Sequence, residues 1–270
     1  MNKLIILLYS VLPKKVIFHL GKSSLLKKIR DQFLRPKKRD VIISLFVKWG
    51  KGSFYFFASP KVAVKAKNKG IENTLLKNSL LLMEKFSIST PTIIDVGANY
   101  GFISLALSSN LAKESSFFSF EPHPQLVDAF KKSLLKNNIK NIHIENVAVG
   151  DINSKIKINL LGQTSNILET GVNIVERIEV NQIVLDDFFR DNNIKPDYVK
   201  IDVDGYELNV LKGMRNTIEK YLPILVVESN GNYEILDFLS HFDYDLRDLN
   251  LLKFDEIPNN IFCIKRNLLN

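Results

Sequence analysis

Short apolar runs and amphipathic segments alternate along most of this chain. After residue 91, each apolar run is followed by a segment whose apolar positions recur every three or four residues. Short continuous apolar runs are typical of buried strands, and the longer period is typical of helices. Strands that alternate with helices predict a parallel sheet with helices on both faces.

The pattern places the predicted elements along the chain. We expect strands at 92–97, 115–122, 142–150, 197–204, 223–229, 244–249 and 260–266. We expect helices at 102–111, 124–137, 186–191, 206–220 and 233–242, and an irregular β-rich stretch at about 154–183. This order predicts one α/β domain.

A different pattern precedes that domain. Residues 41–58 form two β-rich runs around Gly50 and Gly52, which predicts a hairpin, and residues 71–86 have the spacing of an amphipathic helix. We therefore divide the chain into three parts. They are an N-terminal extension at 1–40, a hairpin-and-helix subdomain at 41–90 and the α/β domain at 91–270.

Composition agrees with a soluble globular protein. The chain has 270 residues, 46% of them hydrophobic, and a mean hydropathy of +0.00. It holds one cysteine, Cys263, so no internal disulfide can form and a cysteine-based metal site is not expected. We expect a reducing compartment, that is, a cytoplasmic protein.

Positive charge is concentrated at the N-terminus. The chain carries 37 basic and 29 acidic residues, and residues 1–40 alone hold 11 basic and two acidic ones. The apolar run at 4–12 is shorter than the roughly 20 residues that span a bilayer, and no small-residue cleavage site of a signal peptide follows it. Two interpretations are open, and one is peripheral contact of residues 1–40 with an anionic membrane, at its inner face. The alternative is a solvated extension or a helix packed on the domain.

A nucleic-acid partner is not expected for this extension. Arms that bind nucleic acid combine basic residues with aromatic side chains on which bases stack. The basic residues of 1–40 lack such interleaved aromatic positions.

The stretch IIDVGANYGFISLAL, residues 93–107, joins the first strand of the domain to its helix. In sheets of this kind, ligands bind beyond the carboxyl ends of the strands. Glycines let the backbone turn sharply and approach a ligand, and the start of the following helix offers free N–H donors. The candidate ligand-binding residues of this loop are Asp95, Gly97, Ala98, Asn99 and Gly101.

An acid and a histidine follow the next strand. Glu121 lies 20 residues after Gly101, where an acid commonly accepts hydrogen bonds from ribose hydroxyls. Pro122 and His123 come directly after it. His123 either contacts the ligand or is an exposed loop residue, and the sequence leaves both open. Together with the glycine loop, Glu121 predicts a ligand of the adenosine type.

The details of the loop favour S-adenosylmethionine over NAD. The glycines read G-A-N-Y-G instead of G-x-G-x-x-G, so the backbone lacks the tight spacing that brings its donors to a pyrophosphate. Asp95 places a negative charge beside Gly97. That charge is unfavourable for a pyrophosphate and favourable for the positive amino and sulfonium groups of S-adenosylmethionine, which we expect as the cofactor.

Three further acids lie at the ends of the fourth and fifth strands. They are Asp202, Asp204 and Glu228. Several carboxylates at one edge shift one another's pKa and can supply a general base, so all three are catalytic candidates, and Asp202 is also a candidate cofactor contact. Asp204 has the alternative of capping the next helix, and Glu207 that of stabilising its start. Such acids can hold Mg²⁺, but we assign no metal site.

The motifs follow one another at regular intervals. They read IIDVGANYGFISL, FSFEPHP, NVAVGD, DYVKIDVDGYELNVLKGM and PILVVES. In these motifs, over about residues 70–266, the sequence resembles class I S-adenosylmethionine-dependent methyltransferases of the FkbM family. It departs from the family's usual pattern at Asp204, where Glu is usual, and at Tyr206, where Ala is usual.

The resemblance implies a fold and a set of cofactor contacts. The fold would be Rossmann-like, with a seven-stranded, mostly parallel sheet whose last strand is antiparallel. Asp95, Gly97, Asn99 and Gly101 would surround the methionine part of the cofactor, and Glu121 would bind the ribose. Residues near Val147 and Ala148 would lie by the adenine, and 91–270 would be the catalytic domain.

The resemblance also implies methyl transfer to a hydroxyl group of a sugar, a glycan or another small molecule. Asp202 or Glu228 would take the proton or orient the acceptor. One alternative is an NAD-dependent oxidoreductase, which the glycine spacing and the lack of a Tyr-x-x-x-Lys pair disfavour. Another is a non-catalytic, membrane-tethered binding protein, which the presence of Asp95, Glu121 and Asp202 disfavours.

Overall fold

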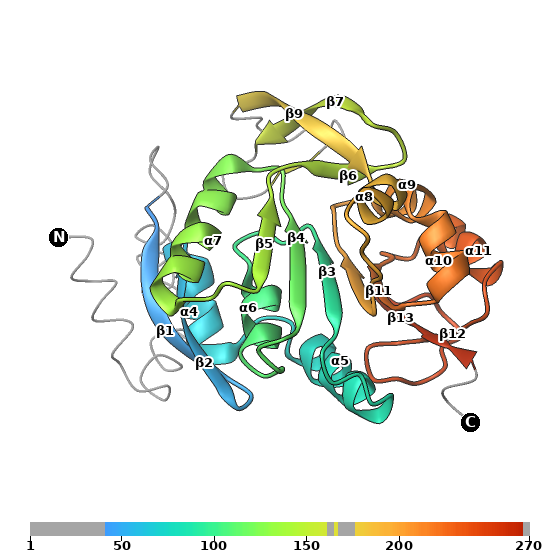
Figure 1. Ribbon diagram of the computed structural model, residues 1–270, viewed down its shortest axis with the longest axis horizontal. Coiled ribbons are helices and arrows are strands. Elements are labelled where there is room, and N and C mark those ends of the chain that lie inside the picture. The colour runs from blue at the N-terminus through green and yellow to red at the C-terminus, as the bar shows by residue number, and fades with distance from the viewer. Residues whose placement is uncertain (1–40, 161–164, 167–175, 267–270) are drawn as a thin grey trace, which may run out of the picture.

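A seven-stranded sheet forms the centre of the molecule. The computed structural model describes residues 41–160, 165–166 and 176–266. The strand order is β12-β13-β11-β10-β3-β4-β5, and within this sheet only β13 runs antiparallel to its neighbours (Figure 1). The strands are β3 (Thr92–Val96), β4 (Ser116–Phe120), β5 (Ile142–Glu145), β10 (Tyr198–Ile201), β11 (Ile224–Glu228), β12 (Tyr244–Arg247) and β13 (Asn260–Lys265). This is the predicted Rossmann-like, class I methyltransferase fold.

The central strands are apolar because both faces of the sheet are covered. Every residue of β10 is buried, and β3 and β11 are each exposed only at one end. Successive residues of a strand point to opposite faces. Ile93 and Val226 accordingly belong to one hydrophobic cluster, and Ile94 and Leu225 to the other.

Helices cover each face of the sheet. The first cluster is completed by α5 (Asn73–Lys85), α6 (Phe102–Ser108) and α7 (Pro124–Asn137). The second is completed by α8 (Leu185–Asp191), α9 (Glu207–Gly213), α10 (Arg215–Tyr221) and α11 (Tyr233–Ser240). None of the helices in the described parts of the chain is long and apolar enough to cross a membrane.

The predicted hairpin is present and packs on the α6 side of the sheet. Strands β1 (Ile43–Trp49) and β2 (Gly52–Ala58) pair antiparallel, and Phe54 and Phe56 both pack edge-on against Phe102 of α6. Helix α4 (Pro60–Lys69), which we did not predict, follows β2. Residues on both sides of position 90 share one hydrophobic cluster, so the division into 41–90 and 91–270 stays a prediction.

A second, smaller sheet lies beside the first. It contains β6 (Ala148–Gly150), β7 (Ser154–Leu160), β8 (Ser165–Asn166) and β9 (Glu176–Val184) in the order β6-β9-β7-β8. The single strand predicted at 142–150 is therefore wrong, because β5 joins the large sheet and β6 the small one. Asn146 holds the break between them by donating from Nδ2 to the carbonyls of Glu121 and Pro122, at 2.9 and 3.0 Å.

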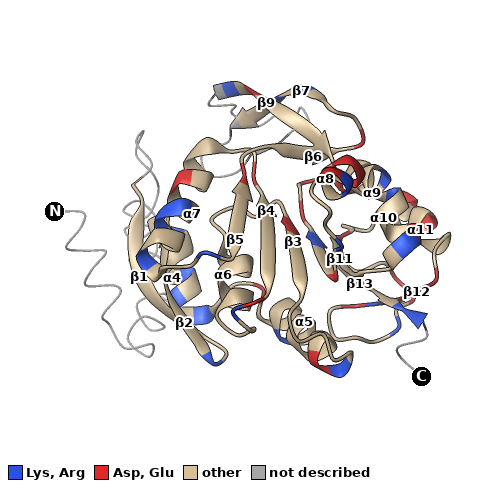
Figure 2. Cartoon of the chain, viewed as in Figure 1, with Lys and Arg blue, Asp and Glu red and all other residues tan. Residues whose placement is uncertain are grey.

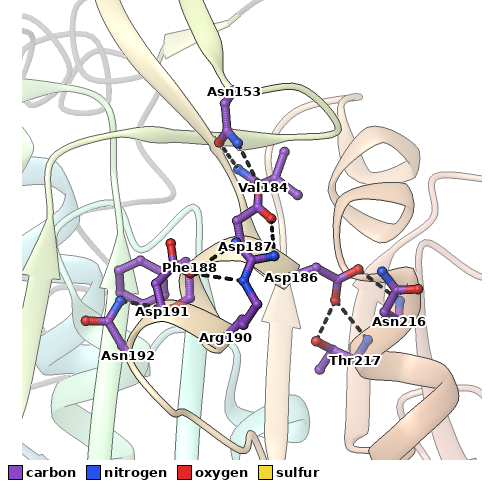
Figure 3. Close-up of polar contacts among 10 residues, drawn as sticks. All are labelled: Asn153, Val184, Asp186, Asp187, Phe188, Arg190, Asp191, Asn192, Asn216 and Thr217. Carbon is purple, nitrogen blue, oxygen red and sulfur yellow. Dashed lines mark hydrogen bonds and ion pairs between the residues drawn. The ribbon is translucent and has the colours of Figure 1, made fainter.

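Two predicted helices differ from their expected bounds by more than two residues. The helix predicted at 206–220 is divided into α9 and α10 at Met214, and α6 ends at Ser108 rather than at residue 111. A side chain of another helix accepts hydrogen bonds from the first N–H groups of α10. Asp186 of α8 accepts hydrogen bonds from the backbone N–H groups of Asn216 and Thr217, at 2.9 and 2.8 Å (Figure 3).

The same helix α8 connects the small sheet to the rest of the domain. Asn153 accepts a hydrogen bond from the backbone N–H of Val184 at 2.8 Å and donates one to Asp187 at 2.6 Å (Figure 3). Asp187 also pairs with Arg190 at 2.8 Å. These contacts fix the small sheet above one end of the large one, where the candidate site lies.

Candidate functional site

The glycine loop between β3 and α6 has the backbone that the sequence predicts. Gly97 and Gly101 have φ angles of 76° and 78°, and Asn99 has one of 52°. A Cβ atom on Gly97 would collide with the backbone carbonyl oxygen of Asp202. The loop therefore packs directly on the end of β10, which brings two predicted motifs together.

A cavity of about 330 Å³ opens beside this loop. A volume of this size falls within the range of small-molecule sites. Nine of the predicted site residues line the cavity: Gly97, Ala98, Asn99, Glu121, Pro122, Val147, Ala148, Asp202 and Asp204. Asp95, Gly101, His123 and Glu228 are not among its lining residues.

Glu121 is held in the wall of the cavity by two backbone groups. Its Oε2 accepts from the N–H of Asn99 at 2.8 Å, and its Oε1 accepts from the N–H of His123 at 2.9 Å. Only 4% of the residue is exposed, and this burial raises the pKa of the carboxyl group to about 7. Each carboxylate oxygen can accept a second hydrogen bond from a ligand.

His123 is buried, so the expectation of an exposed loop residue is wrong. Its Nδ1 accepts from the backbone N–H of Gln125 at 3.3 Å, and His123 is the N-terminal cap of α7. Because its side chain does not line the cavity, contact with a ligand there is not supported either.

Asp95 is buried outside the lining of the cavity, next to a lysine that the sequence analysis did not single out. Asp95 is 1% exposed, and its Oδ2 accepts from the hydroxyl of Ser104 at 2.6 Å. Its Oδ1 makes no hydrogen bond with the described residues. Burial raises the pKa of Asp95, although the charge of Lys200 opposes this.

Lys200 connects the carboxylates of the two motifs. Its Nζ lies 2.9 Å from Oδ2 of Asp202 and 3.8 Å from Oδ1 of Asp95, and it donates to the carbonyl of Gly97 at 3.4 Å. Burial acts to lower the pKa of Lys200, but the two carboxylates outweigh it and raise the pKa. The lysine therefore stays charged and lines the cavity.

Asp202 and Glu228 form a hydrogen-bonded pair with different proton affinities. Burial acts to raise the pKa of Asp202, but the charge of Lys200 and the hydrogen bond from Glu228 hold it below its usual value. Burial and the charge of Asp202 raise the pKa of Glu228 to about 8. At neutral pH, Asp202 is therefore ionised and Glu228 carries the proton between them.

The other two acids of this edge have separate positions. Glu207 is buried and accepts from the backbone N–H groups of Val203 and Gly205, both at 3.0 Å, so it stabilises the turn before α9. Asp204 lines the cavity and has a φ of 52°, and no side chain caps α9. The structure thus supports a role of Glu207 in stabilising the start of α9. It does not support a role of Asp204 as the cap of that helix. Within the described residues, no three acidic, histidine or cysteine side chains are grouped to hold a metal ion.

One family model matches the part of the chain that contains the predicted motifs. The profile described as Methyltransferase FkbM domain matches residues 95–246, which include the glycine loop, Glu121 and the edge from Lys200 to Glu228. The chain belongs to the FkbM methyltransferase family. Among curated proteins, no sequence matches the chain.

Solved structures of methyltransferases resemble this FkbM family member at low sequence identity. A methyltransferase FkbM from Methylobacillus flagellatus KT is 17% identical with a TM-score of 0.45, and the match covers 65% of this chain but only 44% of that one. A methyltransferase from Geobacter sulfurreducens is 12% identical with a TM-score of 0.41, over 97% and 96% of the two chains. A precorrin-6y C5,15-methyltransferase from Geobacter metallireducens is 14% identical with a TM-score of 0.41, over 69% and 85%.

Proposed function

We propose that this protein is an S-adenosylmethionine-dependent O-methyltransferase that acts on a hydroxyl group of a sugar, a glycan or another small molecule. Membership of the FkbM family supports methyl transfer. The observation that carries the proposal is the arrangement of Gly97, Glu121 and Asp202 around one cavity, with the buried Asp95 next to Lys200 of its lining.

The residues around the cavity fit the cofactor. Gly97, Ala98 and Asn99 of the glycine loop line the cavity, so a ligand there can lie against this loop. Oδ1 of Asp95 is buried without a hydrogen bond from the described residues, and the charged Nζ of Lys200, which lines the cavity, lies 3.8 Å from it. Glu121 offers a fixed carboxylate for vicinal hydroxyls.

When bound, S-adenosylmethionine supplies a methyl group on a positively charged sulfur atom. The protein's own residues must hold the acceptor oxygen in line with that group and exclude water. Effective positioning of this kind contributes up to about 7–11 kcal/mol to the barrier reduction in ideal intramolecular cases. Asp202 is placed for this role because it lines the cavity and Lys200 fixes its side chain.

The Asp202–Glu228 pair provides the acceptor for the hydroxyl proton. Asp202 accepts a hydrogen bond from the hydroxyl group of the acceptor. This bond orients a lone pair of the hydroxyl oxygen toward the methyl group. Glu228 does not line the cavity. Its protonation state determines whether the pair can accept the proton of the hydroxyl group. The rate of methyl transfer is therefore expected to rise with pH as Glu228 loses its proton near pH 8.

The test is transfer of an isotope-labelled methyl group to a set of oligosaccharides and small hydroxyl compounds, followed by NMR of the product. A methyl ether and S-adenosylhomocysteine are the expected products. Asp202→Asn should lower turnover by about 100-fold or more and leave the affinity for S-adenosylhomocysteine within a few-fold. The matched control is Glu234→Gln, which changes an exposed acid in α11.

Two outcomes would contradict the proposal. Transfer to nitrogen or carbon would reject the hydroxyl acceptor. Reduction of NAD with no methyl transfer would support the oxidoreductase instead.

A further inference from the structure

The helix α4, the hairpin β1–β2 and the helix α7 form one outer layer, which we call the hairpin layer. The backbone of β2 is bonded along its edge to α7. Tyr55 exchanges two hydrogen bonds with the side chain of Asn137, both at 2.8 Å, and the N–H of Phe57 donates to Ser133 at 3.0 Å. Helix α4 packs against β1 and β2. The hairpin therefore joins α4 and α7 into one layer.

This layer is strongly basic, unlike the rest of the described chain. Residues 41–71 hold six lysines and no acidic residue, and residues 124–140 hold four lysines and one aspartate. All ten lysines are exposed. Figure 2 shows the blue segments on α4, α7 and the hairpin at the left of the molecule. Outside these two ranges and residues 1–40, the chain has 26 acidic and 16 basic residues. Among the described residues, the excess of basic over acidic residues is therefore confined to these two ranges.

Large apolar side chains are exposed among these lysines. Leu135 of α7 is 84% exposed and lies next to Lys136 in the chain. Phe46 and Tyr55 face each other across the hairpin and are 44% and 40% exposed. Lys48 is exposed two residues from Phe46, on the same face of β1. Surfaces that bind anionic bilayers typically combine lysines with exposed aromatic and aliphatic side chains.

The aromatic side chains are unsuited to stacking with nucleic-acid bases. The rings of Phe46 and Tyr55 pack edge to face, with their centroids 5.2 Å apart. The Nζ of Lys136 lies over the Tyr55 ring, 5.1 Å from its centroid. Base-stacking platforms need open ring faces, and an exposed Leu135 contributes nothing to phosphate contacts. The exposed apolar groups therefore favour a lipid surface over RNA.

We propose that the outer side of the hairpin layer is a docking surface for anionic phospholipid bilayers. Lysines of β1 and α7 bind the lipid headgroups, and Phe46, Tyr55 and Leu135 enter the boundary of the acyl chains. Phe56 of β2 and Lys65 of α4 line the cavity from the same layer, so a docked bilayer lies one element away from the candidate site.

The test uses the full chain, so that residues 1–40 are the same in every variant. Binding is measured by co-sedimentation with vesicles of phosphatidylcholine alone and with vesicles of equal parts phosphatidylcholine and phosphatidylserine. The charge variant is Lys48→Gln with Lys131→Gln and Lys132→Gln. The matched control is Lys113→Gln with Lys212→Gln and Lys253→Gln, three exposed lysines outside the layer. The apolar variant is Phe46→Ser with Leu135→Ser.

We expect wild type and control to bind only the vesicles that contain phosphatidylserine. The charge variant should bind these at least about tenfold more weakly, and the apolar variant several-fold more weakly. All variants change exposed side chains, and equal thermal unfolding midpoints will show that they fold. Equal binding by the charge variant and the control would overturn the proposal. Binding to polyuridylic acid without binding to vesicles would also overturn it.

Discussion

Lys200 is the residue on which the charges of the candidate site depend. It lies between two carboxylates, 2.9 Å from Asp202 and 3.8 Å from Asp95, and the side chains of Lys200 and Asp95 are buried whereas that of Asp202 is 40% exposed. Without it, the two acids would face each other uncompensated, which would favour protonation of the buried Asp95. Because it is present, Asp202 stays ionised and Glu228 takes up the proton.

Glu121 predicts a pH dependence of cofactor binding. Its pKa of about 7 in the empty protein means that the carboxylate is only partly ionised at neutral pH. Ribose hydroxyls donate to the ionised form, so binding should release a proton. The affinity for S-adenosylhomocysteine should therefore rise about tenfold between pH 6 and pH 8, as measured by calorimetric titration. Glu121→Gln should bind weakly with no such dependence. A constant affinity for the wild type would contradict this role.

Gly97 predicts a steric effect on the loop. Gly97→Ala should lower the free energy of unfolding by at least about 2 kcal/mol, because the new Cβ atom would meet a backbone carbonyl that cannot move away easily. Gly231→Ala is the matched control, since Gly231 has a φ of 77° and nothing within 4 Å of its added Cβ atom. Urea unfolding of both variants measures the difference. An equal loss in the two variants would mean that only the backbone angle matters.

The sequence predicted these site residues unevenly. The glycine loop and Glu121 were predictable because a loop after a strand has few other reasons to hold those residues. Lys200 was not, because it interrupts an apolar strand and its pairing with Asp95 depends on the register of β10 and β3. The capping role of His123 was missed because its ring nitrogen acts as the acceptor at the start of α7.

At the scale of the elements, clear boundary signals gave accurate predictions. Helix α7 has the predicted bounds, since it begins with Pro124 and is followed by Asn138 in a left-handed conformation. Helix α4 was missed because its buried positions are Pro60, Ala63 and Ala66, which give little contrast with the polar face. The break between β5 and β6 depends on contacts of Asn146 with a distant part of the chain, which no local pattern contains.

The contacts of α8 predict a stability effect away from the site. Asp186 accepts three hydrogen bonds at the start of α10, including one from the hydroxyl of Thr217 at 2.6 Å (Figure 3). Asp186→Ala should lower the free energy of unfolding by about 1–2 kcal/mol without changing cofactor affinity. Glu179→Ala, which removes the exposed ion pair with Lys155, should change the free energy of unfolding by less than about 0.5 kcal/mol. Denaturant unfolding distinguishes the two, and equal effects would reject the capping role of Asp186.

At the scale of the whole molecule, basic residues are unevenly distributed. The hairpin layer is basic and the rest of the described chain has more acidic than basic residues. The sequence showed the charge of residues 1–40, which lie outside the described residues. It did not show that α4 and α7 belong to one layer, because their proximity depends on the fold.

Buried acids also predict how the stability of the whole protein changes with pH. Folded-state pKa values of about 7 for Glu121 and about 8 for Glu228 lie above the 4.5 of an unperturbed Glu. The folded state therefore holds protons that the unfolded state releases, and the free energy of unfolding should fall as pH rises from about 5 to about 8. Glu228→Gln should make this fall smaller in urea unfolding of the ligand-free protein. A rise in stability over this range would contradict the assignment.

The central claim is that the cavity binds S-adenosylmethionine, and calorimetric titration with S-adenosylhomocysteine tests it most directly. NAD serves as the parallel ligand. The account predicts micromolar binding of S-adenosylhomocysteine (on the order of −8 kcal/mol), little or no binding of NAD, and at least about tenfold weaker binding of S-adenosylhomocysteine by Asp95→Asn. Clear binding of NAD with none of S-adenosylhomocysteine would contradict it.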